Sequence, residues 1–148
     1  MKICSVELKG NDAVICMLTM DDELFDIPDC RVRKVSIEKT TSSKQLKFFQ
    51  QTFAKLMVDY QIDSVIIRER PTKGKFAGGA VGFKLEAAIQ LIENLDVELM
   101  TPALIKESIK KNPIPIAFDE TGLKGFQETA FVTAYAYFMH LKYADPAE

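Results

Sequence analysis

The sequence predicts a mixed α/β fold in which a five-stranded sheet carries helices on both faces. Two observations lead to this prediction. Before residue 40, segments of the chain alternate between apolar and polar residues, which is typical of strands. After residue 40, segments with apolar residues at helical spacing alternate with short β-branched runs. The expected order of elements is βββαβαβα. With 148 residues and 47% hydrophobic content, the chain has the size and composition of one domain, which we expect over residues 1–148.

The first three strands are expected to form an antiparallel meander. A Gly-Asn-Asp turn joins the first strand to the second. In the first strand Glu7 shares one side with Ile3 and Ser5. The three strands are predicted at 2–8, 13–18 and 33–39.

Helices and strands alternate through the rest of the chain. A helix that ends near Gln61 follows the cap residues 41–43. Residues 64–67 form a consecutive apolar run, which is typical of a strand covered on both faces, and we expect this strand beside the first one. The remaining elements are predicted as a helix over 81–92, a strand over 97–100, a helix or turn over 104–111 and a closing helix over 126–141.

Charge and cysteine content exclude several classes of protein. Nineteen basic and 21 acidic residues give a net charge of -2, so no overall field marks a nucleic-acid-binding protein. The segment 31–75 is nevertheless basic, with eleven basic and four acidic residues. Three widely spaced cysteines suggest neither a disulfide framework nor a zinc site. The only histidine, His140, follows an apolar helical run, which argues against a Ser/His/Asp or Cys/His catalytic arrangement.

No apolar run approaches the ~18 to 20 residues that cross a bilayer, so no membrane partner is expected. The first residues also lack the long apolar stretch of a signal peptide. We therefore expect a cytoplasmic protein.

Three acidic residues lie in segments that resemble a known family. Glu7 follows a Met-Lys-Ile start, Glu69 closes an apolar strand, and Glu128 begins the closing helix pattern. Their order is similar to that of the RuvC-type resolvase branch of the ribonuclease H-like superfamily, as are the segments 78–88 and 99–106. The resemblance implies a ribonuclease H-like fold. It is closer to a small bacterial family of unknown function within this superfamily than to a junction resolvase.

The sequence departs from that branch at two places. Its first acid is Glu7, where the branch normally has Asp. The last helix lacks the Asp-x-x-Asp pair, because neither residue three positions from Glu128 is acidic. Asp119 or Glu120 could supply a further ligand only if the loop before this helix folds back over the sheet.

The resemblance implies that Glu7, Glu69 and Glu128 are the catalytic residues and bind Mg²⁺ or Mn²⁺. Two such ions would activate water and stabilise the leaving oxygen of a phosphodiester. At an effective dielectric constant of ~20, two carboxylates ~5 Å apart repel by roughly 3 kcal/mol, so a cluster needs a metal, a proton or a basic partner. Each residue also has a structural explanation: an exposed strand edge for Glu7, an ion-pair run with Arg68 and Arg70 for Glu69, and the helix dipole for Glu128.

A dense basic segment follows Glu69. We expect Arg70, Lys73 and Lys75 to bind substrate, because such side chains beside flexible glycines can hold phosphates next to the acids. A solvated surface loop would have the same composition, so both interpretations stay open.

These features predict a RuvC-like metal-dependent nuclease or nucleic-acid-binding protein that acts on the phosphodiester backbone of structured DNA or RNA. The alternative is a non-catalytic binding or assembly module of the same fold. Phe48, Tyr135 and Phe138 lie beside the apolar helical stripes. Core packing explains them most simply, and a contact in a homodimer is the other explanation.

Overall fold

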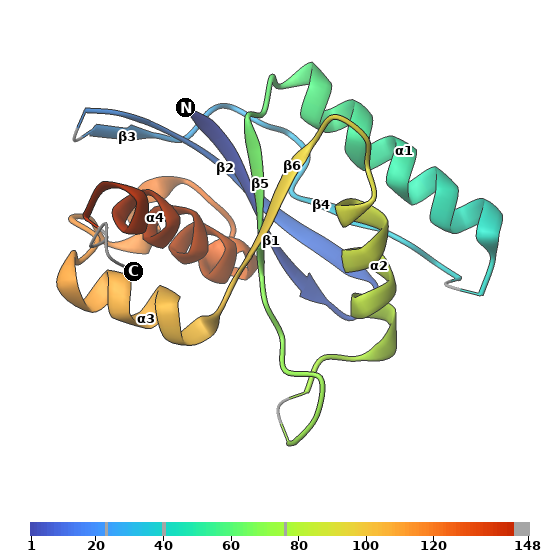
Figure 1. Ribbon diagram of the computed structural model, residues 1–148. Helices are drawn as coiled ribbons and strands as arrows, with labels where there is room; N and C mark the ends of the chain where they lie inside the picture. Colours follow the sequence, from blue (N-terminus) through green and yellow to red (C-terminus); the bar gives the residue numbers. More distant parts are fainter. Residues whose placement is uncertain (23, 40, 76, 144–148) are drawn as a thin grey trace.

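A computed structural model describes residues 1–22, 24–39, 41–75 and 77–143. Its elements confirm the predicted alternation of strands and helices (Figure 1). In chain order they are β1 (Lys2–Lys9), β2 (Asp12–Asp21), β3 (Leu24–Asp26), β4 (Lys34–Ser36), α1 (Ser43–Asp59), β5 (Ser64–Arg68), α2 (Ala80–Gln90), β6 (Asp96–Met100), α3 (Pro102–Lys111), the 3₁₀ turns η1 (Phe118–Thr121) and η2 (Gly125–Gln127), and α4 (Glu128–Tyr143).

The strands form one mixed sheet in the order β3-β2-β1-β5-β6. β1 pairs antiparallel with β2, and it pairs in parallel with β5, where Ile3 lies opposite Ser64. β6 continues the parallel part beyond β5. The fourth predicted strand therefore lies beside the first, as expected. The carboxyl ends of β1 and β5 consequently meet at the same edge of the sheet.

Helices cover both faces of this sheet, which confirms the predicted fold class. Figure 1 shows α1 and α2 on one face and α3 and α4 on the other. Alternate residues of each strand enter two separate cores: Ile3 and Ile66 pack with α4, whereas Val65 and Ile67 pack with α1 and α2. We call these sides the α4 face and the α2 face.

The edge beyond β2 differs from the prediction. The expected strand at 33–39 is limited to the three residues of β4, and the unpredicted β3 pairs with the other end of β2. Pro28 lies in the irregular segment between them and has no amide N–H to donate to a sheet ladder. The described residues therefore form six strands rather than five.

The segment predicted as a helix or turn over 104–111 is the helix α3. The side chain of Thr101 accepts a hydrogen bond from the amide of Leu104, and Pro102 occupies the first turn. Because only Thr101 separates the end of β6 from Pro102, α3 begins at the carboxyl edge of the sheet.

Two of the three aromatic residues beside the helical stripes belong to the core. Tyr135 and Phe138 are buried on the α4 face, whereas Phe48 on α1 is 70% exposed. Core packing therefore explains the first two, and they offer no exposed surface for a homodimer contact.

Two hydrogen bonds from buried polar side chains hold the start of α4 on the sheet. The hydroxyl of Ser5 in β1 donates to the carbonyl of Ala130, and the amide of Gln127 donates to the carbonyl of Ile15 at 2.9 Å. A buried polar group without a partner costs about 1–3 kcal/mol, so these contacts specify where α4 lies.

No helix in the described part of the chain is long and apolar enough to span a membrane.

Candidate functional site

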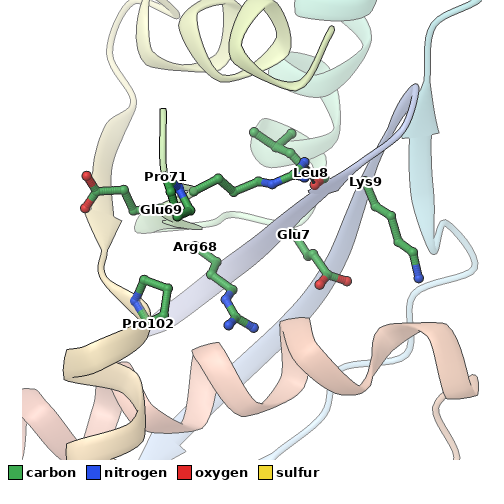
Figure 2. A pocket seen from close by; sticks show the side chains of 8 residues that line it. Glu7, Leu8, Lys9, Arg68, Glu69, Pro71 and Pro102 are labelled. Carbon is green, nitrogen blue, oxygen red and sulfur yellow. Dashed lines mark hydrogen bonds between the residues drawn. The ribbon is translucent and has the colours of Figure 1, made fainter. Parts of the chain in front are cut away.

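A groove of about 520 Å³ lies at the carboxyl ends of β1 and β5 (Figure 2). Ligands of open α/β sheets commonly bind at this edge, because loops there leave the sheet in different directions. We call it the carboxyl-end groove. Its lining residues are Glu7, Leu8, Lys9, Arg68, Glu69, Arg70, Pro71 and Pro102.

Glu7 and Arg68 lie on the α4 face of the groove. The parallel register pairs Val6 with Ile67, so the next residues along the two strands, Glu7 and Arg68, are neighbours. Both are half-buried. Figure 2 shows their side chains directed to the same side, toward α4. A carboxylate and a guanidinium therefore share this face.

Glu69 points the other way. It continues the ladder, since its amide donates to the carbonyl of Met100 at 2.9 Å. Figure 2 shows its carboxylate directed away from Glu7. Burial, and to a smaller extent the charge of Glu69, raises the pKa of Glu86 on α2. Glu69 thus lies close enough to affect a carboxyl group of the α2 face.

Glu128 is the first residue of α4 and is exposed. It lies seven residues, or about two turns, before Tyr135 and so on the same flank of the helix. The Tyr135 ring packs edge-on against Phe25 in β3, with ring centroids 5.5 Å apart. This flank faces the β2–β3 side of the sheet rather than β5. Asp119 and Glu120 are exposed on η1.

The predicted ligands are therefore not brought together in this structure. Within the described ranges, no group of three or more His, Cys, Asp and Glu side chains could hold a metal ion. Mg²⁺ and Mn²⁺ are hard cations that need several convergent oxygen ligands. The arrangement of Glu7, Glu69 and Glu128 does not fit such an ion.

Arg70 is held by contacts within the protein. Its guanidinium donates a hydrogen bond to the carbonyl of Leu8 at the end of β1. It also lies against two glycines: a Cβ atom would be 3.1 Å from its Nε at Gly78 and 3.3 Å from its Nη1 at Gly82. The glycines therefore make room for Arg70, which ties β1 to α2.

Lys73 extends the groove along the loop after β5. A second depression, of about 390 Å³, contains Lys73 and Thr101 and shares Glu69, Arg70, Pro71 and Pro102 with the groove. Lys73 is exposed, as is Lys75, which does not line either depression.

Three charged residues of this region were not among the predicted site residues. Lys9 and Arg68 line the groove, and Glu86 lies on α2 near Glu69. The face that Arg68 takes was not evident from the sequence, because the strand before it is apolar on both sides and shows no alternation. Glu86 had no signal either, because its position depends on how α2 packs against the sheet.

Comparison with known proteins supports the fold and defines a family. A family model described as protein of unknown function (DUF3010) matches residues 1–137. The structure is similar to that of Thermus thermophilus RuvC, with a TM-score of 0.72, 7% sequence identity and 96% of each chain covered. T. thermophilus RuvC in complex with Holliday junction substrate gives a TM-score of 0.70 at 8% identity, with 96% of each chain covered. No curated protein matches the sequence significantly. At these identities the likeness confirms the ribonuclease H-like fold.

Proposed function

We propose that this chain, which belongs to the family of proteins of unknown function DUF3010, binds the phosphodiester backbone of nucleic acid in the carboxyl-end groove. The observation that carries this proposal is the excess of cations along the groove and its extension. Four cationic side chains line them, Lys9, Arg68, Arg70 and Lys73, against two carboxylates, Glu7 and Glu69.

Such an arrangement suits a phosphate chain. Lys and Arg side chains neutralise phosphates without regard to base sequence, and these contacts supply most of the non-specific affinity of nucleic-acid-binding proteins. Arg70 already donates to the carbonyl of Leu8 and adds only its charge, whereas Lys9, Arg68 and Lys73 lie from the end of β1 to the loop after β5, where successive phosphates could contact them.

The groove is also open to solvent. Lys9 and Pro71 in its lining are exposed, as is Lys73 in the adjoining depression. An open groove admits a continuous strand, whereas small-molecule sites usually enclose most of their ligand.

The fold comparison supports the same class of ligand. One of the similar structures is T. thermophilus RuvC with a Holliday junction. Structured DNA, including branched DNA, is therefore the first substrate class to test. Hydrolysis is not part of this proposal, because the carboxylates that the resemblance assigns to the metal ions lie apart.

Fluorescence anisotropy with labelled single-stranded, duplex and four-way junction DNA, and with duplex RNA, would test the proposal. We expect affinity to fall as salt rises, and each of Lys9→Gln and Lys73→Gln to reduce the logarithmic salt slope by about 1. Lys47→Gln, a change of equal charge at an exposed position on α1, is the matched control and should leave the slope unchanged.

Two results would contradict the proposal. One is the absence of binding to all four nucleic acids at low salt. The other is an equal loss of affinity in Lys47→Gln, which would indicate a response to net charge rather than to the groove. Adding Mg²⁺ or Mn²⁺ and separating the products on a denaturing gel would detect cleavage in the same samples.

A further inference from the structure

The residue that lies beside Glu7 across the β1–β5 ladder is an arginine. In a metal-dependent nuclease centre built on these two strands, a second carboxylate would be needed next to Glu7 to share the ion. Arg68 occupies this place instead, and Figure 2 shows the carboxylate of Glu69, the residue after β5, directed away from Glu7.

The two cores fix this arrangement. Ile66 and Ile67 are both completely buried, but they lie in different cores on the two faces of the sheet. A shift of one residue in β5 would exchange these side chains between the cores, and the strand is therefore held in its register. Arg68, the last residue of β5, therefore shares a face with Glu7.

In the part of the chain that the structure describes, no hydrogen bond or ion pair joins the Arg68 guanidinium to another residue. Arg70, by contrast, already donates to the carbonyl of Leu8. Of the two half-buried arginines of the groove, Arg68 is the one available to a ligand.

We propose that Arg68 is the phosphate-binding residue of the carboxyl-end groove, and that it binds a backbone phosphate without a divalent metal ion. The inference rests on the proposed nucleic-acid binding and specifies its chemistry. A guanidinium keeps its charge at all physiological pH values and presents a planar set of N–H donors that matches two phosphate oxygens. It supplies the positive charge that a metal ion would otherwise supply.

Removal of the Glu7 carboxylate should have opposite effects on phosphate binding in a metal site and in the Arg68 site. In a metal site the Glu7 carboxylate would be a ligand, and its removal would weaken binding of a phosphate through the ion. In the Arg68 site its negative charge opposes the phosphate, so its removal should strengthen binding.

The experiment measures, by fluorescence anisotropy, binding of whichever of the four labelled nucleic acids wild-type protein binds most tightly, in EDTA and in 5 mM MgCl₂. The variants are Arg68→Gln, Arg68→Lys, Glu7→Gln and, as a matched control, Arg31→Gln at an exposed position before β4. Thermal unfolding of each variant establishes that it is folded.

We expect wild-type affinity in EDTA to equal or exceed that in MgCl₂. Arg68→Gln should lose about tenfold in affinity, a typical effect of one charged hydrogen-bonding group, and its salt slope should fall by about 1. Arg68→Lys should retain part of the affinity, because the charge remains but the paired donors are lost. Glu7→Gln should bind more tightly than wild type, and Arg31→Gln should bind as wild type does.

Binding that requires MgCl₂, weakens in Glu7→Gln and is unchanged in Arg68→Gln would overturn the inference while leaving the proposed function in place. Absence of binding by wild-type protein in both buffers would overturn the two together. The two failures are therefore distinguishable.

Discussion

At the carboxyl edge of the sheet, the charged side chains of the α2 face and of the α4 face have different surroundings. On the α2 face, Arg70 is tied to the carbonyl of Leu8, and Glu86 lies in an environment that raises its pKa. On the α4 face, Glu7 and Arg68 lie side by side at the surface of the groove. Proximity in sequence therefore does not define a common role: Arg68 and Arg70 differ by two residues, yet among the described residues only the Arg70 guanidinium has a hydrogen-bond partner.

Of the changes that test this difference between the faces, we expect removal of the Arg70 guanidinium to have the largest effect on stability. Arg70→Met keeps much of the side-chain length but removes the hydrogen bond to Leu8, and we expect the free energy of unfolding to fall by about 2 kcal/mol. Arg68→Met, the matched change on the other face, should alter it by less than about 0.5 kcal/mol. Urea unfolding at pH 7 measures both. Equal losses in the two variants would remove the distinction between the faces.

A smaller effect is expected from pH on the α2 face. Burial and the charge of Glu69 raise the pKa of Glu86 above its ordinary value of 4.5. The folded state then holds its proton over a pH range in which the unfolded state has lost it, so this group's contribution to stability falls as pH rises through the raised pKa. Glu86→Gln cannot ionise and should therefore be more stable than wild type at pH 7 but similar to it at pH 4.

Urea unfolding of Glu86→Gln and Glu69→Gln at these two pH values tests this expectation. Because burial is the larger cause of the shift, Glu69→Gln should recover only part of the gain. A Glu86→Gln gain that is the same at both pH values would contradict the pKa explanation.

The smallest effect is expected from divalent metal. An ion bound at about 100 times its dissociation constant would add about 2.7 kcal/mol and raise the melting temperature by several degrees. Since Glu7 and Glu69 lie on different faces, 5 mM Mg²⁺ or Mn²⁺ should shift the melting temperature of wild type and of Glu69→Gln equally, by less than about 1 °C. A shift of several degrees in wild type that disappears in Glu69→Gln would show that the two faces cooperate in a metal site.

The sequence could predict most of the fold because its strands and helices carry strong periodic patterns. The strand over 64–67 and its place beside the first strand were predicted correctly. β3 was missed because three residues, only one of them half-buried and the others exposed, are too short to show a period.

The sequence predicted that Glu7 and Glu69 belong to neighbouring strands, and β1 and β5 do pair. The carboxyl ends of β1 and β5 do form a groove, but the face of Glu69 could not be read from the sequence. In a strand covered on both sides every residue is apolar, so the pattern does not show which face each residue takes. The contact of Arg70 with Leu8 joins positions 62 residues apart and depends on how α2 packs, which no local pattern records.

The hydrogen bonds that hold α4 on the sheet also have a consequence for the order of folding. Ser5 and Ala130 are separated by 125 residues, and Gln127 and Ile15 by 112. Contacts of such long range form late and slow a chain's folding. During synthesis the α4 face of β1 therefore stays uncovered after the α2 face has gained its helices.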